Sequence, residues 1–340
     1  MYREGVIMTA ESEVENHSEA DVRPHAANLL TLGTRCFFKN AIVYRLPESF
    51  SLSAAEFEEK LYARRLTDCG ALEKERTGWV NSSPLGRTVH ALEGHFLIAL
   101  GTHKKLLPAS AIKEEFNKRL ARMEQEQGIT LGRKQKKELK ETVKEQLLAK
   151  AMVRTSATRA WIDTEERWVV VEASGSARAE AVIHELIETL GSFEATRVEA
   201  DPDASVTMGK WVMDFSAPDE FTLDMDLELK SDSKAVIRYT NHPLDGQDIK
   251  THLLEGKTVN RLGLIWNDRV SFMLTAALEL KKLKYLEFSD EEAESGEEKD
   301  KPSPEELFEA DFSLMASELS QLLGALVKAL TPEEEEGKAS

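Results

Sequence analysis

Cysteine is scarce in this sequence, which has only Cys36 and Cys69 among 340 residues. Neither lies in a Cys-x-x-Cys pair or a Cys/His cluster, which argues against a disulfide framework and a zinc finger and favours a reducing cytoplasm. Long apolar runs are also missing: stretches such as 96–100 and 168–171 are far shorter than the roughly 20 residues of a transmembrane helix. The first 33 residues lack the basic and apolar regions of a signal peptide. We therefore expect a cytoplasmic protein with no membrane partner.

Recognisable catalytic and metal-binding motifs are missing as well. The stretch EGKT at 255–258 resembles the end of a phosphate-binding loop, but Thr251 stands where that loop needs its first glycine. His90 and His95 are five residues apart, whereas a helical zinc pair needs a spacing of four. No GxSxG motif occurs, and neither cysteine lies in a nucleophile signature. We therefore expect no metal, no cofactor and no enzymatic activity.

Charge is abundant and unevenly distributed. The formal net charge is −17, which taken alone argues against a polyanionic partner. Residues 103–159 nevertheless contain fifteen Lys or Arg and seven acids, for a local charge of +8, whereas residues 287–340 reach −13. This asymmetry predicts a protein with one basic surface and an acidic tail.

The basic segment has the apolar spacing of two helices. The spacing predicts one helix over 111–127 and a second after the turn at 128–133. The apolar positions are Ile112, Phe116, Leu120 and Met123 in the first helix, and Leu139, Val143 and Leu147 in the second. Two helices joined by so short a turn form a hairpin. Lys136, Lys140 and Lys144 line up beside the second apolar face, as either a solvated surface or a surface that meets phosphates.

Outside the hairpin, strands and helices are mixed without regular alternation, which predicts an α+β fold with antiparallel sheets. Strands are predicted over 36–46, 78–80, 95–100, 158–174 (a β-hairpin), 205–215, 222–229, 234–240, 260–275 and 285–288. Helices are predicted over 53–65, 177–190 and 247–254. A capping box that starts at Ser303 opens a long amphipathic helix.

Composition divides the chain into seven segments. They are a disordered N-terminal extension (1–35), an N-terminal α+β part (36–107), the basic helical hairpin (108–152), a central α+β part (153–288), an acidic linker (289–302), a C-terminal amphipathic helix (303–330) and an acidic tail (331–340). The basic helical hairpin is therefore the candidate binding surface.

Several stretches, in consistent order and spacing, resemble the RdgC family of bacterial recombination-associated proteins. They are FFKNAIVYRL at 37–46, GWV at 78–80, LLP at 106–108, WIDT at 161–164, LGS at 190–192, KWV at 210–212, EGKTVNRLGLIWNDRVSF at 255–272, LKKLK at 280–284 and FEADFSLMASEL at 308–319. The resemblance implies an α+β fold in a homodimer that closes into a ring with a basic central hole.

The resemblance also implies a function. It implies binding of double-stranded DNA, and of single-stranded DNA as well, without sequence preference, in the nucleoid. It further implies no catalysis and functional antagonism of the RecA recombinase. The candidate DNA-binding residues are Lys134, Lys136, Lys137, Lys140, Lys144, Lys150, Arg154, Arg159, Lys257 and Arg261. The sequence leaves two roles open for Arg269, which either contacts DNA or pairs with Asp268 or a backbone group.

Two other functions compete with this one. The chain could be an acidic protein-interaction scaffold that uses the apolar helix face at 308–326 and never touches DNA. It could also be a nuclease whose acids hold a metal, although no tight cluster of Asp, Glu and His is apparent. Salt-dependent binding to random duplex DNA separates the DNA-binding reading from the scaffold.

Overall fold

The computed structural model describes residues 35–286 and 303–331, apart from 129, 201–202 and 219. The acidic linker, all but the last residue of the predicted N-terminal extension and all but the first residue of the acidic tail therefore lie outside the described residues. The same holds for the second half of the strand predicted over 285–288.

The described residues form seven helices and twelve strands. The helices are α1 (Ala54–Ala63), α2 (Ala109–Gln127), α3 (Arg133–Ala149), α4 (Ser176–Leu190), α5 (Ala204–Asp214), α6 (Gln247–Leu254) and α7 (Pro304–Leu330). The strands are β1 (Asn40–Arg45), β2 (Glu75–Val80), β3 (Val89–Leu92), β4 (His95–Lys105), β5 (Val153–Asp163), β6 (Trp168–Val171), β7 (Thr196–Arg197), β8 (Phe221–Lys230), β9 (Val236–Tyr239), β10 (Thr258–Trp266), β11 (Val270–Thr275) and β12 (Glu279–Tyr285).

All twelve strands belong to one sheet in which every pairing is antiparallel. Its main path runs β2-β4-β5-β6-β1-β12-β11-β10-β8-β9, with β3 on β4 and β7 on β1. The sheet has no parallel crossover, so the predicted α+β class with antiparallel strands is confirmed. The strand pair β1 and β12 joins the first and the last strand of the described chain at the middle of the sheet.

Most predicted helices are confirmed within a few residues, and local capping explains their starts. Ser53 accepts a hydrogen bond from the Glu56 backbone at α1, and Ser303 does the same for Glu306 at α7. The strand predicted over 205–215 is wrong, because this segment is helix α5. Its buried positions recur at helical spacing and pack against the sheet: Ala204, Thr207, Met208, Trp211 and Val212.

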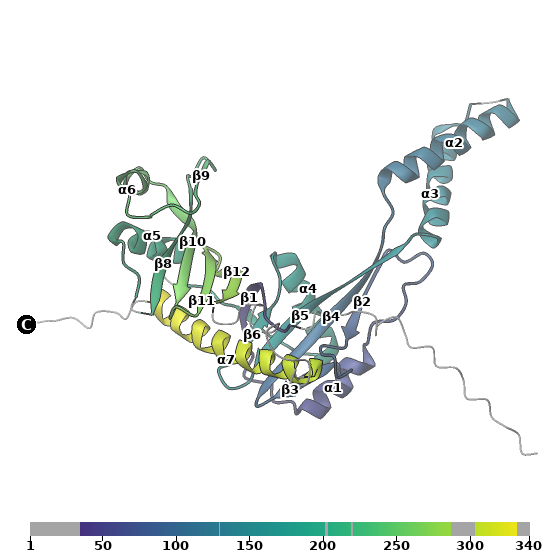
Figure 1. The fold of residues 1–340 in the computed structure, drawn as a ribbon. Coiled ribbons are helices and arrows are strands. Elements are labelled where there is room, and N and C mark those ends of the chain that lie inside the picture. Colours follow the sequence, from purple (N-terminus) through teal and green to yellow (C-terminus); the bar gives the residue numbers. More distant parts are fainter. Residues whose placement is uncertain (1–34, 129, 201–202, 219, 287–302, 332–340) are drawn as a thin grey trace, which may run out of the picture.

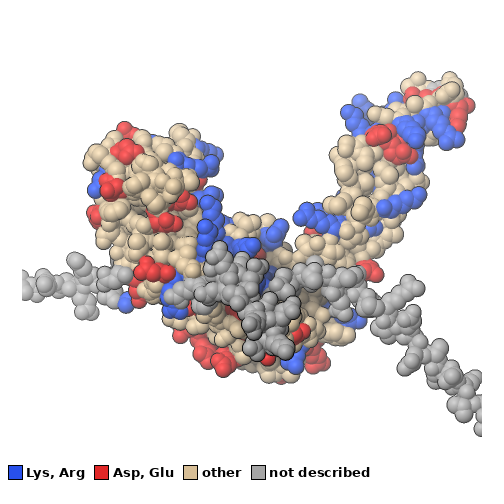
Figure 2. Space-filling model, viewed as in Figure 1, with Lys and Arg blue, Asp and Glu red and all other residues tan. Residues whose placement is uncertain are grey.

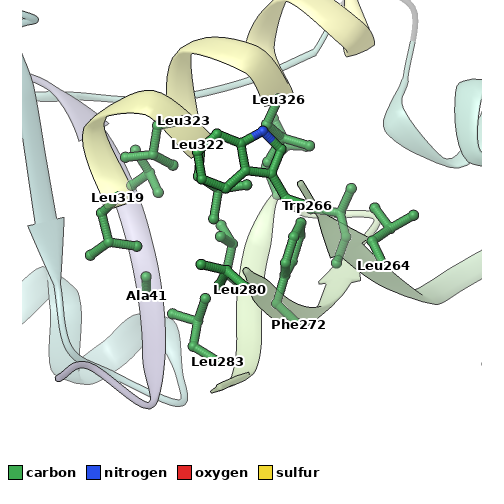
Figure 3. Packing of buried hydrophobic residues seen from close by; sticks show 14 of the residues in the cluster. Ala41, Leu264, Trp266, Phe272, Leu280, Leu283, Leu319, Leu322, Leu323 and Leu326 are labelled. Atoms are coloured by element: carbon green, nitrogen blue, oxygen red, sulfur yellow. The ribbon is translucent and has the colours of Figure 1, made fainter. Parts of the chain in front are cut away.

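Helix α7 crosses one face of the sheet and packs on both halves of the molecule (Figure 1). Figure 3 shows its leucines against side chains of β1, β10, β11 and β12. Leu319 and Leu322 are fully buried there. In β1, Ala41 belongs to this core, whereas the next residue, Ile42, belongs to the second core on the other face, with side chains from α1 and α4. Alternation along one strand thus separates the two cores.

Polar contacts fix α7 at points along its length. The Asp311 carboxylate accepts hydrogen bonds from Arg35 Nε at 2.8 Å and from the Cys36 backbone N–H at 3.3 Å. Ser320 donates to the buried Asp163 at 2.7 Å. Glu318, whose side chain is 2% exposed, pairs with Arg269 beside the β10–β11 turn. The apolar face of α7 is therefore committed to its own chain.

The molecule is hollowed on one side (Figures 1 and 2). Strands β4 and β5, with β2 paired to β4 as far as Lys104, extend beyond the rest of the sheet as a ribbon and carry α2 and α3 away from it. We call residues 109–149 the arm, and residues 204–286, which contain α5, α6 and β8 to β12, the C-terminal lobe. The space between the arm and this lobe is the hollow (Figure 2).

Candidate nucleic-acid interface

The arm consists of two helices that contact each other through a thin apolar seam and a few polar pairs. Val143 and Leu148 of α3 are buried in the seam. Arg119 of α2 donates to Gln146 of α3, and Lys136 Nζ lies 3.3 Å from Glu124 Oε1. Because so few side chains are buried, most lysines of α3 remain at the surface.

The structure separates the predicted arm cations into two groups. Lys136 and Lys144 have acidic partners, Lys144 Nζ lying 3.0 Å from Glu141 Oε2. The side chains of the other five are exposed and have no hydrogen bond or ion pair with another described residue. These five are Lys134, Lys137, Lys140, Lys150 and Arg154. They are the cations most readily available to an external anion.

Arg154 and Lys150 mark the base of the arm. Arg154 lies on β5 directly opposite Lys104 of β4. Lys104 is 63% exposed and pairs with Glu75 on its other side. The ribbon thus adds further positive charge where the arm leaves the sheet.

Arg159 lies in the interior instead of the proposed interface. Its Nε donates to Glu172 at 2.8 Å, and its other nitrogens donate to the carbonyl oxygens of Arg35 and Phe37 at 3.1 and 3.4 Å. Burial alone would lower the pKa of Arg159, but Glu172 outweighs it and holds the pKa above its ordinary value. Since its guanidinium is enclosed, we leave Arg159 out of the interface.

The later predicted cations lie on the C-terminal lobe. The Lys257 side chain is 19% exposed, and its Nζ lies 2.7 Å from Glu255 and 3.0 Å from His252 Nδ1. The Arg261 side chain is 47% exposed on β10. Arg269, the open case, pairs with Glu318 of α7. Lys257 and Arg269 are thus held by their own chain, and Arg261 is the more available of the three.

One face of the C-terminal lobe is left open by the described helices. Helices α5, α6 and α7 share a core with Leu262, Leu264 and Trp266 of β10, so all three lie on one side of the sheet. The alternate residues, such as Arg261, point to the other side. In Figure 1, α5 and α6 lie on the outer side of the lobe, so this open face is turned toward the arm.

Cations that the sequence reasoning missed lie on this open face. They are Arg238 on β9 and Lys282 and Lys284 on β12. The usable signal was the pattern of 280–284, in which buried Leu280 and Leu283 alternate with lysines. Figure 2 shows Lys and Arg gathered on the side of the lobe that faces the arm.

The charge of this surface suits a polyanion. Lysines and arginines from the arm, the β4–β5 ribbon and the open face border the same hollow, although the whole chain is acidic. Such an arrangement binds phosphates by charge without reading bases. Within the part of the chain that the structure describes, no three His, Cys, Asp or Glu side chains are grouped to hold a metal. The described helices also include none that is long and apolar enough to cross a membrane.

The fold and surface define an α+β protein with one continuous antiparallel sheet and a basic hollow. A family model described as "Putative exonuclease, RdgC" matches residues 36–333. The chain belongs to the RdgC family, as the sequence resemblance predicted.

Curated relatives agree with this assignment. A protein of Dechloromonas aromatica (strain RCB) is 39% identical over 307 residues, which span 89% of this chain and all of the relative. A protein of Cupriavidus necator is 39% identical over 296 residues, 86% of this chain and 98% of the relative. One of Bordetella pertussis is 35% identical over the same shares. All three are named "Recombination-associated protein RdgC". The relatives' name and the family description thus point to different activities, recombination and exonuclease.

Proposed function

We propose that this protein binds DNA without sequence preference, enclosing the duplex as a ring-shaped homodimer, and restrains recombination by the RecA recombinase. It also binds single-stranded DNA, acts in the cytoplasm on the nucleoid, and performs no catalysis. The relatives' printed name supports the link to recombination. The DNA contact is supported by the basic hollow.

The observation that carries the proposal is the position of the available cations. Lys140, Lys150 and Arg154 are exposed and have no described ionic partner, and Arg261 lies across the hollow on the open face. The whole chain has a net charge of −17, which by itself opposes binding to DNA. Gathering cations around one hollow offsets that repulsion where the duplex would lie.

A binding measurement on duplexes of random sequence tests the proposal. Fluorescence anisotropy of labelled 30-base-pair duplexes should show binding of similar strength for unrelated sequences, because phosphate contacts carry no base information. The scaffold alternative expects no binding to any of them. The structure disfavours that alternative, since Phe308, Phe312 and Leu319 of the proposed docking face are fully buried in their own chain.

The dimer is tested by sedimentation. We expect a species of about twice the 38.1 kDa chain mass at micromolar concentration. The expectation comes from the family resemblance and from the open side of the hollow, which a second copy would close. It does not come from α7, whose apolar face is already covered. A monomer that still binds DNA tightly would contradict the ring.

The absence of catalysis is tested because the family description names an exonuclease. We expect homogeneous protein to leave end-labelled duplex and single-stranded DNA intact with magnesium or manganese present. The physical reason is that two-metal cleavage needs a carboxylate cluster, which neither the sequence motifs nor the described residues supply. Metal-dependent shortening of the DNA that a single carboxylate substitution abolishes would overturn this part of the proposal.

A further inference from the structure

A carboxylate lies between two arginines on the open face of the C-terminal lobe. Glu228 of β8 stands opposite Arg238 of β9 and opposite Arg261 of β10 in the strand registers. Arg238 Nε lies 2.7 Å from Glu228 Oε2, and Arg261 Nε lies 3.8 Å from Oε1. The Asn260 side-chain amide donates to Oε1 as well. One carboxylate on β8 therefore holds cations from the two strands that flank it, β9 and β10.

The three side chains differ sharply in exposure. Glu228 is recessed, with its side chain 8% exposed, whereas the side chains of Arg238 and Arg261 are 69% and 47% exposed. Burial alone would raise the pKa of Glu228, but hydrogen bonds from Arg238 and Asn260 and the charges of both arginines hold it below its ordinary value. The carboxylate is thus ionised at neutral pH, and the guanidiniums above it face solvent.

We infer that Glu228 is a positioning residue that holds Arg238 and Arg261 in place. Its negative charge also competes with DNA phosphates for these two arginines and so weakens the binding of DNA to the open face. This inference rests on the proposed function. A guanidinium has donors on more than one edge, so each arginine can meet a phosphate while it faces Glu228. The carboxylate nevertheless reduces the charge of the group from +2 to +1.

The physical consequence is a limit on affinity. A phosphate can contact the outer donors of either guanidinium while Glu228 stays beneath it. The recessed carboxylate opposes this contact, because it keeps its negative charge under the bound phosphate. Asp226, also on β8, lies 3.8 Å from Lys282 of β12, so a second carboxylate faces a cation of the open face. The carboxylates therefore lower the affinity of the open face for DNA below the value that its cations alone would give.

The test compares full-length wild type with E228Q, using anisotropy of a fluorescein-labelled random 30-base-pair duplex over a salt series. Gln keeps the size of the side chain and an oxygen that accepts from Arg238. We expect E228Q to bind about fivefold more tightly at 50 mM salt, with a gain that shrinks as salt rises and a salt slope steeper by about one. A purely structural carboxylate would lower thermal stability and leave the slope unchanged.

Matched variants make the result specific. E185Q is the control, since Glu185 is similarly recessed, with its side chain 11% exposed, and pairs with Arg64 between α4 and α1; its affinity should match wild type. R238Q should bind about threefold more weakly than wild type, and E228Q/R238Q should lose most of the E228Q gain. If E228Q fails to fold, R238Q decides, because unchanged affinity in R238Q contradicts the inference.

The outcomes for the inference and for the proposed function are distinct. Wild-type binding with a steep salt slope, together with an E228Q variant of equal affinity and slope, overturns the role of Glu228 and leaves DNA binding intact. Absence of any wild-type binding overturns the proposed function, and the inference falls with it.

Discussion

Replacing Lys150 and Arg154 together by glutamate is expected to weaken binding to every duplex by about 100-fold at low salt. Both side chains are exposed at the base of the arm and have no ionic partner among the described residues. The double reversal changes the local charge from +2 to −2, so it removes two phosphate contacts and adds repulsion. The slope of log affinity against log salt should fall by about two.

The control for this experiment is Lys60→Glu. Lys60 is exposed on α1, which lies on the outer side of the molecule away from the hollow (Figure 1). It should change affinity little. A loss in the double variant that depends on the duplex sequence would contradict the account, because a phosphate contact does not distinguish bases. An unchanged affinity would place the arm base outside the DNA path.

Among the substitutions proposed here, removing Arg269 is expected to lower the free energy of unfolding most. Arg269→Ala leaves the carboxylate of Glu318 buried without its cation, a change that typically costs about 3–5 kcal/mol. The measurement is the free energy of unfolding from urea denaturation. The loss should be local in origin, because this pair holds the middle of α7 against the β10–β11 turn.

Two further variants check the cause. The double variant Arg269→Ala/Glu318→Leu should recover much of the free energy of unfolding that Arg269→Ala loses. It removes the buried carboxylate, so no unpaired charge is left in the interior. Arg122→Ala removes an exposed arginine that pairs with Glu126 one turn along the arm, and it should leave the urea midpoint unchanged. A small effect of Arg269→Ala would mean that α7 is held by its apolar contacts alone.

Local signals predicted the helices well where spacing and capping agreed. The arm helices and α7 follow from apolar residues at intervals of three and four and from the Ser303 capping box. Helix α5 was missed because Val206, Trp211 and Val212 favour strands by composition, whereas the buried positions have helical spacing. Tertiary packing against β10 decided the outcome.

Long-range pairing was beyond the sequence reasoning. Strand β1 pairs with β12, more than 230 residues away, and no local pattern specifies that partner. The position of Arg159 has a similar cause: its charge was visible, but the enclosure by Glu172 and the backbone before β1 arises only when the sheet forms.

The candidate site was predictable in part for the same reason. Counting charges located the arm, because its lysines lie close together in the sequence. Of the open face only Arg261 was found, because Arg238, Arg261 and Lys284 come from three strands and share a face only through the sheet order. Glu228 could not be assigned a role until Arg238 and Arg261 were seen on either side of it.

The most direct test of the central claim is the equilibrium constant for wild-type protein on random duplex DNA, measured from about 50 to 300 mM salt. The account predicts a straight line of log affinity against log salt with a slope of several units, the same for unrelated sequences. That slope counts the phosphates neutralised by the cations of the hollow. No binding at the lowest salt, or an affinity that salt does not change, would contradict the claim that the hollow is a DNA site.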